Sequence, residues 1–194
     1  VGAAIQAWHM GDFWVFGYGS LIWRPGFAHV ETQRARLFGY RRSLCVYSFV
    51  HRGTRERPGL VLGLDRGGSC VGLAFRVPGE LHGEVIAYLR EREQVTQVYL
   101  ERTLDVRLES GLSVPAVAYC PQRRGGQYAG ALDEADAATV VAGAVGQSGR
   151  NEDYVFNTLE HLGALGIRDR WLEGVARRVV PHGKEDGAKA LSSL

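Results

Sequence analysis

The stretch FWVFGYGSLIW, residues 13–23, limits most strongly what this chain can fold into. Its aromatic and aliphatic residues predict a buried strand over Phe13–Tyr18, but Gly17 and Gly19 interrupt the run before the apolar residues resume at Leu21. Glycine weakens a strand, so its presence there usually marks a bend or a close approach of the backbone to another group. The fold must therefore accommodate an apolar strand that breaks at a glycine-rich loop.

Strand-like segments fill the first two thirds of the chain, and one helix interrupts them. Hydrophobic patterning predicts strands over Phe13–Tyr18, Ala35–Phe49 (one long strand or two joined strands), Leu60–Leu64, Cys70–Val77, Val95–Leu108 and Val114–Cys120. The turn-forming residues Asp65-Arg66-Gly67-Gly68 predict a hairpin between the third and the fourth of these strands. A helical period predicts a helix over Leu81–Gln94, and 26 glycines indicate many tight turns.

The last third of the chain is helical in character. Its periodicity predicts helices over Leu132–Val145, Glu152–Leu165 and Asp169–Val179. Asn151 suits the N-cap of the second helix, and Gly166 suits its C-terminal stop. Strands and helices are thus segregated, which favours an α+β fold over the strand–helix alternation of a doubly wound sheet. A length of 194 residues suits one domain, which we expect over residues 13–180, with a leader (1–12) and a tail (181–194) outside its core.

The composition argues against several classes of function. The formal net charge of +2 gives no electrostatic case for a nucleic-acid partner, and arginine pairs such as Arg41-Arg42 are interpreted as solvated surface. Cys45, Cys70 and Cys120 are widely spaced without a CxxC motif, and the six histidines show no metal-binding spacing. We therefore expect neither a disulfide framework nor a metal site. Since no apolar run reaches transmembrane length and no signal peptide is present, we expect a cytoplasmic protein without a membrane partner.

The glycine-rich interruption fits none of three common loop chemistries. A dinucleotide-binding fingerprint needs a third glycine where Ile22 stands, and the chain has no Gly-Lys-Ser/Thr phosphate loop. A nucleophile elbow has the order Gly-x-Ser-x-Gly, whereas here Ser20 directly follows Gly19. What remains is a strand whose backbone N–H groups turn toward a small ligand, with the Ser20 hydroxyl as a further donor and acceptor. A β-bulge without any ligand is the alternative, and the loop by itself does not decide between the two.

Several further motifs accompany this loop in a fixed order. They are VFGYGSLIW, His51-Arg52-Gly53, Arg57-Pro58-Gly59-Leu60-Val61, GLAFRV, a helix ending Tyr88-Leu89-Arg90-Glu91-Arg92-Glu93, and Ser148-Gly149-Arg150-Asn151. Together they resemble the ChaC family of glutathione-specific γ-glutamylcyclotransferases, over most of the chain. The resemblance implies a small mixed β-barrel, mostly antiparallel, with surrounding helices. It also implies a lyase that converts glutathione to 5-oxoproline and cysteinylglycine without a metal or cofactor.

The resemblance also implies a set of site residues. Those of the loop, which would hold the γ-glutamyl group, are Val15, Phe16, Gly17, Tyr18, Gly19, Ser20 and Leu21. Glu93 matches the position of the family's catalytic glutamate, and Tyr154 would supply a further hydrogen bond to the substrate or pack as a half-buried tyrosine. The segment after Glu93 lacks the glycines that family members carry there, so Glu91 competes for the catalytic assignment. The two cannot share a helical face, because residues two apart point about 200° from each other.

The implied reaction needs one carboxyl group and no enzyme nucleophile. The α-amine of the substrate would attack its own γ-carbonyl, while a carboxylate takes a proton from the amine and returns one to the leaving nitrogen. Glu93, at the C-terminal end of a helix and partly buried, is expected to have a raised pKa. Arg90 and Arg92 are expected to face solvent.

Other interpretations stay open from the sequence. The substrate could be another γ-glutamyl amine or peptide, or the pocket could only bind a small acidic molecule or a partner protein. Arg52 or Arg57 could meet the glycine carboxylate of glutathione, although solvated loop arginines are the simpler interpretation. The oligomeric state, a monomer or a weak dimer, is not fixed by the sequence.

Overall fold

The computed structural model describes residues 11–94 and 98–179. These residues form two compact units. The barrel unit comprises the described residues up to Val46 together with Leu62–Gly130, and the helical unit comprises Tyr47–Val61 and the described residues from Ala131 onward. Residues 1–10 and 180–194 lie outside the described residues, so the predictions of a leader and a tail are not tested there. The prediction of one domain over residues 13–180 stays a prediction.

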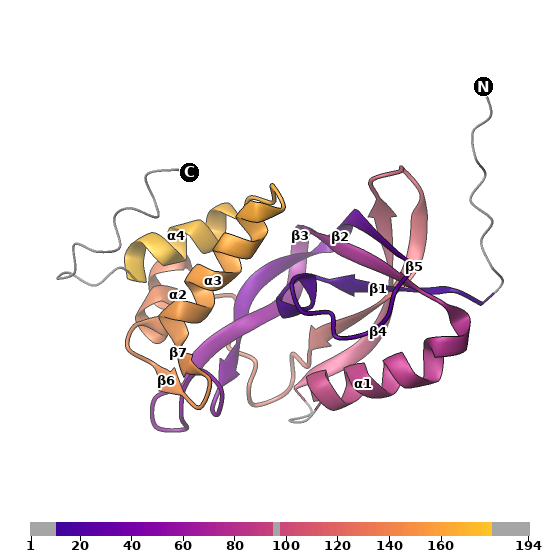
Figure 1. Ribbon diagram of the computed structural model, residues 1–194. Helices are drawn as coiled ribbons and strands as arrows, with labels where there is room; N and C mark the ends of the chain where they lie inside the picture. The colour runs from indigo at the N-terminus through magenta and orange to yellow at the C-terminus, as the bar shows by residue number, and fades with distance from the viewer. Residues whose placement is uncertain (1–10, 95–97, 180–194) are drawn as a thin grey trace. The chain divides into compact units, whose positions relative to one another are not determined.

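A closed barrel with strand order β1-β3-β2-β4-β5 dominates the first unit (Figure 1). The strands are β1 (Phe13–Gly17), β2 (Glu31–Ser48), β3 (Gly59–Val77), β4 (Tyr99–Leu108) and β5 (Ser113–Pro121). β1 pairs antiparallel with β3 and parallel with β5, whereas β4 pairs antiparallel with both β2 and β5. This confirms the predicted α+β class and the mixed, mostly antiparallel barrel.

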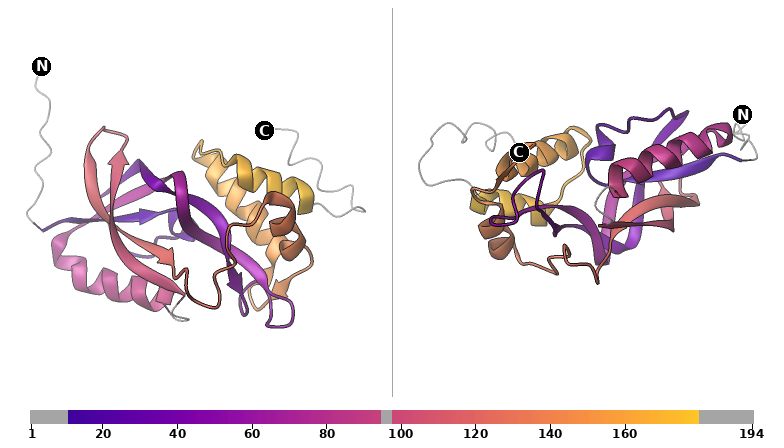
Figure 2. Two further views of the ribbon diagram at one scale, coloured as in Figure 1. Left: turned by 180° about the vertical axis from the view of Figure 1, so that it is seen from behind. Right: turned by 90° about the horizontal axis from the view of Figure 1, so that it is seen from below.

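One helix belongs to the barrel unit and lies along the barrel wall. α1 (His82–Gln94) follows a short 3-10 turn, η2 (Gly79–Leu81), and packs beside β4 (Figure 2, right view). Val85 and Leu89, one helical turn apart, share the apolar face and pack with Val15, Leu21 and the ring of Tyr119. Burying such a side chain contributes about 1.5–3 kcal/mol, so this cluster fixes α1 on the barrel.

The predicted hairpin at Asp65–Gly68 is wrong. β3 runs without a break from Gly59 to Val77, and the positive φ angles of Gly67 (98°) and Gly68 (68°) fall inside the strand. Glycine adopts these angles at no steric cost, so the strand changes direction there without ending. The predicted strand over Val95–Leu108 begins at Tyr99, and residues 95–97 lie outside the described residues.

The helical unit contains three helices and a small two-stranded sheet. They are α2 (Glu134–Val141), β6 (Val145–Gly146), β7 (Gly149–Arg150), α3 (Asn151–Ala164) and α4 (Arg170–Val179). α4 packs on both α2 and α3 (Figure 2, left view). Gly166 lies just beyond α3 with φ of 64°, which confirms the predicted stop.

The predicted N-cap at Asn151 is wrong, because Asn151 is already the first residue of α3 and Arg150 occupies the cap. The fully buried Asn151 side chain instead accepts a bond from the Leu60 backbone N–H (2.6 Å) and donates to the Leu60 carbonyl oxygen (2.8 Å). Its amide therefore bonds the start of α3 to the start of β3 as a strand partner would.

Candidate functional site

The glycine-rich interruption is the end of β1 followed by a single 3-10 turn. β1 stops at Gly17, and the turn η1 (Ser20–Ile22) follows at once. The Ile22 N–H donates to the Gly19 carbonyl oxygen (2.9 Å), and the Arg24 N–H donates to the Ser20 carbonyl oxygen (2.9 Å). We call Gly17–Leu21 the glycine loop. The break is therefore a strand end and not a β-bulge within the ladder.

Two contacts inside the barrel unit hold the glycine loop in place. The buried Tyr18 hydroxyl donates to the Tyr119 carbonyl oxygen (2.8 Å), and the Tyr18 carbonyl oxygen accepts from Arg42 Nε (2.6 Å). Arg42 also donates to the Val71 carbonyl oxygen (2.6 Å) and is only 6% exposed. Its predicted place on the solvated surface is wrong, because the guanidinium group satisfies backbone carbonyls in the interior.

The two loop glycines are needed for different reasons. A Cβ on Gly17 would lie 3.1 Å from Leu21 Cβ and 3.2 Å from the Phe75 ring, which is tighter than nine in ten real Cβ contacts. A Cβ on Gly19 would meet the Leu62 side chain at 3.6 Å, an ordinary van der Waals distance. Packing within the barrel therefore accounts for the glycine at position 17 but not for the glycine at position 19.

Glu93 lies in the last turn of α1 with its side chain 19% exposed. Burial raises the pKa of its carboxyl group, and the nearby charge of Arg92 opposes that shift. The raised pKa agrees with the prediction for this residue. Glu91, its competitor for the catalytic assignment, is exposed.

Arg92 connects Glu93 to the glycine loop. Its Nε lies 3.3 Å from Glu93 Oε1, and its Nη2 donates to the Ser20 hydroxyl oxygen at 2.8 Å. Nη1 donates to the Arg24 carbonyl oxygen (2.6 Å), and the side chain is 23% exposed. The expectation that Arg92 faces solvent is therefore wrong, since one guanidinium group contacts both the carboxylate and the serine.

The charge of Glu93 also reaches the loop tyrosine. Burial is the main cause of the raised pKa of Tyr18, and the neighbouring Tyr99 and Glu93 raise that pKa further. By contrast, Arg90 has a 56% exposed side chain and pairs with Glu101 at 2.7 Å. Of the two arginines beside Glu93, only Arg92 is held among the site residues.

The remaining predicted binding residues divide into two groups. Val15 and Phe16 are at most 1% exposed, so a ligand could meet them only through their backbone. Tyr154 lies in α3 of the helical unit, where the Arg52 guanidinium carbon stands 5.3 Å from its ring centre. Arg52 also donates to the Ser148 carbonyl oxygen (2.7 Å), and Arg57 donates to that of Ala142 (2.9 Å). The role of Tyr154 in substrate binding stays a prediction.

Other site types find no support in the part of the chain that the structure describes. Residues 11–94 and 98–179 contain no cluster of three His, Cys, Asp or Glu side chains able to hold a metal ion. All three cysteines are buried, and burial raises the pKa of Cys45 to about 12 and that of Cys120 to about 11. Among the same described residues, no helix has the length and apolarity that crossing a bilayer requires.

The closed mixed barrel, with a partly buried carboxyl group near the glycine loop, is similar in fold to solved γ-glutamyl cyclotransferase structures. The glutathione-specific γ-glutamyl cyclotransferase structure from yeast matches 90% of this chain and 99% of its own, with a TM-score of 0.78 at 23% identity. A second γ-glutamyl cyclotransferase structure matches 94% of this chain and 99% of its own, with a TM-score of 0.54 at 14% identity. These likenesses establish the fold.

Sequence comparison establishes the family. The glutathione-specific γ-glutamylcyclotransferase of Escherichia coli K12 is 33% identical over 159 residues, which are 82% of this chain and 69% of that protein. The γ-glutamylcyclotransferase 2-3 of Arabidopsis thaliana is 35% identical over 176 residues, 86% of this chain and 87% of that protein. The family model of ChaC-like proteins matches residues 13–181. The chain belongs to the ChaC family.

Proposed function

We propose that this protein is a γ-glutamylcyclotransferase that cleaves glutathione to 5-oxoproline and cysteinylglycine. One observation carries the proposal: the partly buried Glu93 carboxyl group has a raised pKa and is joined through Arg92 to Ser20 of the glycine loop. The names of the E. coli and yeast relatives support glutathione as the substrate.

The reaction is internal to the substrate. The nitrogen of its α-amine attacks its γ-carbonyl carbon, a five-membered lactam forms, and the amide bond to the cysteine nitrogen breaks. The attacking amine loses a proton and the leaving nitrogen gains one, so the atoms balance without water or an external group. The protein must bend the glutamyl chain into this geometry and move the proton.

Glu93 is suited to the proton transfer. A general acid–base group works best with a pKa near the working pH, and burial moves the Glu93 pKa in that direction. Ionised Glu93 takes the proton from the attacking ammonium group and then passes it to the leaving nitrogen. Arg92 acts as a positioning residue, because it holds the carboxylate and the loop serine with one rigid group.

The glycine loop is suited to the developing oxyanion. The first N–H groups of a helical turn have no carbonyl partner within that turn, and those of Ser20 and Leu21 begin η1. Directed at the γ-carbonyl oxygen, such donors stabilise the charge that forms during attack. The absent side chain of Gly19, which packing does not require, leaves room for the substrate beside this backbone.

The first experiment compares the wild-type protein with Glu93→Gln and with the control Glu91→Gln. Each is incubated with reduced glutathione, and 5-oxoproline and cysteinylglycine are followed by mass spectrometry. Because glutamine cannot transfer the proton, we expect Glu93→Gln to lose at least about 100-fold in kcat, in the range of general acid–base catalysis. Glu91→Gln should keep wild-type activity, since its side chain is exposed on another face of α1.

Two results would contradict the proposal. Equal activity of Glu93→Gln and wild type would remove Glu93 from the mechanism. No product from the wild type would remove glutathione as the substrate, and a panel of other γ-glutamyl amines would then separate a related cyclotransferase from a protein that only binds its ligand.

A further inference from the structure

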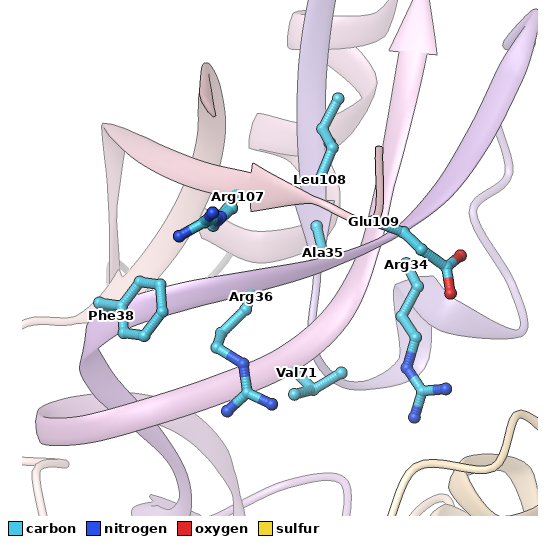
Figure 3. A pocket seen from close by; sticks show the side chains of 8 residues that line it. All are labelled: Arg34, Ala35, Arg36, Phe38, Val71, Arg107, Leu108 and Glu109. Carbon is cyan, nitrogen blue, oxygen red and sulfur yellow. The ribbon is translucent and has the colours of Figure 1, made fainter. Parts of the chain in front are cut away.

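The barrel unit carries a second pocket, whose lining includes no residue of the glycine loop or α1. A pocket of about 390 Å³ opens on the face of β2 and β4, with Arg34, Arg36, Arg107, Phe38, Val71 and Glu109 among the residues that line it (Figure 3). Its three arginines and one glutamate give a net charge of +2. None of these residues takes part in the proposed glutathione chemistry, so the pocket is argued independently of that proposal.

Strand register places the arginines on one face of the sheet. Arg36 of β2 stands directly opposite Arg107 of β4, so the two side chains leave the same face of the sheet. Arg34 precedes Arg36 by two residues and shares that face, because strand side chains alternate. Like charges directly opposite one another destabilise a sheet. A bound anion would turn this unfavourable arrangement into a favourable one.

An exposed aromatic ring completes the pocket. Phe38 is 59% exposed and follows Arg36 by two residues, which places it on the same face of β2. In Figure 3, Phe38 lies at one end of the pocket and Glu109 at the other, with Arg36 between them and Arg107 pointing toward the Phe38 end. Arg34 and Arg36 extend in one direction on either side of Val71. A flat apolar face thus lies at one end of a pocket lined by three cationic side chains.

The Arg36 guanidinium group keeps donors that a ligand can use. Arg36 Nη1 donates to the Ser69 hydroxyl oxygen (3.0 Å), a neutral partner that leaves the positive charge in place. Arginine binds phosphate oxygens through paired N–H groups, and aromatic rings stack on nucleobases. The pocket volume lies within the range of about 300–1,000 Å³ that small-molecule sites occupy.

We propose that this pocket binds a nucleoside phosphate. The base stacks on Phe38, and the phosphates lie over Arg36 and Arg107, with Arg34 further along the pocket. Glu109 at the far end repels additional phosphates, so a mono- or diphosphate fits this charge pattern better than a triphosphate.

Calorimetric titration tests the proposal with ADP, adenosine and inorganic pyrophosphate as separate probes. The wild-type protein should bind ADP more tightly than either fragment. The double variant Arg36→Gln/Arg107→Gln should lose about tenfold or more in affinity for ADP and pyrophosphate, because charge-assisted hydrogen bonds disappear. Phe38→Ala should weaken ADP binding and leave pyrophosphate binding unchanged. Arg124→Gln removes an exposed arginine of the same unit outside the pocket and should bind like the wild type.

Stability and activity provide two further readouts. At low salt Arg107→Gln should melt at the same temperature as the wild type or higher, because it relieves the repulsion with Arg36. The double variant should still cleave glutathione at the wild-type rate, which separates this site from the proposed active site. No ADP binding by the wild type, or equal binding by the double variant, overturns the proposal. Equal affinity for ADP and pyrophosphate, unaffected by Phe38→Ala, overturns the nucleoside assignment.

Discussion

At the residue scale, the site depends on two neighbours in α1. Burial raises the pKa of Glu93, and Arg92 lowers it while also contacting Ser20. The sequence predicted Glu93 because its motif stands in a recognisable order. It could not predict Arg92, since the contact depends on a loop 72 residues earlier in the chain being brought to the end of α1. The adjacency of an arginine to the expected catalytic glutamate was the one available signal.

Replacing Arg92 should change the pH dependence of the reaction. In Arg92→Met the opposing charge is gone, so the Glu93 pKa rises further and the fraction of ionised base at a given pH falls. The acid limb of the kcat/KM profile should therefore move to higher pH, with kcat lowered about 10- to 100-fold by the loss of positioning. Arg92→Lys keeps the positive charge but loses the planar guanidinium group with its paired N–H donors. The acid limb of its kcat/KM profile should therefore stay near that of the wild type, while kcat is still reduced. An Arg92→Met profile that overlays the wild type would remove the positioning role.

The two glycines of the loop should respond oppositely to alanine. Gly19→Ala has room within the protein, so its melting temperature should stay near that of the wild type while kcat/KM falls about tenfold or more, because the new methyl group enters the space proposed for substrate. Gly17→Ala crowds Leu21 and Phe75 and should cost about 1–3 kcal/mol of stability. Thermal melts and initial rates of both variants check this. Full activity in Gly19→Ala would place the substrate elsewhere.

At the scale of elements, the hydrophobic pattern of the sequence predicted which segments form strands and helices. The strands of the barrel and the helix before Glu93 follow from hydrophobic period, and their existence is confirmed with shifted ends. The hairpin at Gly67-Gly68 was wrong because positive-φ glycines permit a turn without requiring one, and pairing with neighbouring strands decides whether the strand continues. The β6 and β7 strands have two residues each, too few for any period to show.

Asn151, the first residue of α3, bonds a backbone segment that is distant in the sequence. Asn151→Ala leaves the buried Leu60 N–H and carbonyl oxygen without these partners, so it should cost about 2–4 kcal/mol of stability. Asn157→Ala makes the same change at an exposed position of α3 and should stay within about 0.5 kcal/mol of the wild type. Urea unfolding measures both. Equal stabilities of the two variants would show that the Asn151 bonds contribute no net stability.

At the scale of the whole molecule, the question is whether the two compact units unfold together. Two of the three boundaries between them fall inside β2 and β3, between Val46 and Tyr47 and between Val61 and Leu62, and the third follows Gly130. A strand is stabilised along its whole length by its ladder, so a boundary inside two strands favours joint unfolding. The family match over residues 13–181 also spans both units. We therefore expect the single domain predicted from the sequence to unfold in one transition.

Calorimetry on two variants tests this expectation. Leu89→Ala creates a cavity in the barrel unit and should cost about 2–5 kcal/mol, and Asn151→Ala weakens the helical unit. If unfolding is cooperative, each variant moves one shared transition to lower temperature, and the calorimetric and van't Hoff enthalpies agree. Two transitions, of which each variant moves a different one, would show two domains instead. In that case β2 and β3 would have to fray at the boundary before either unit unfolds.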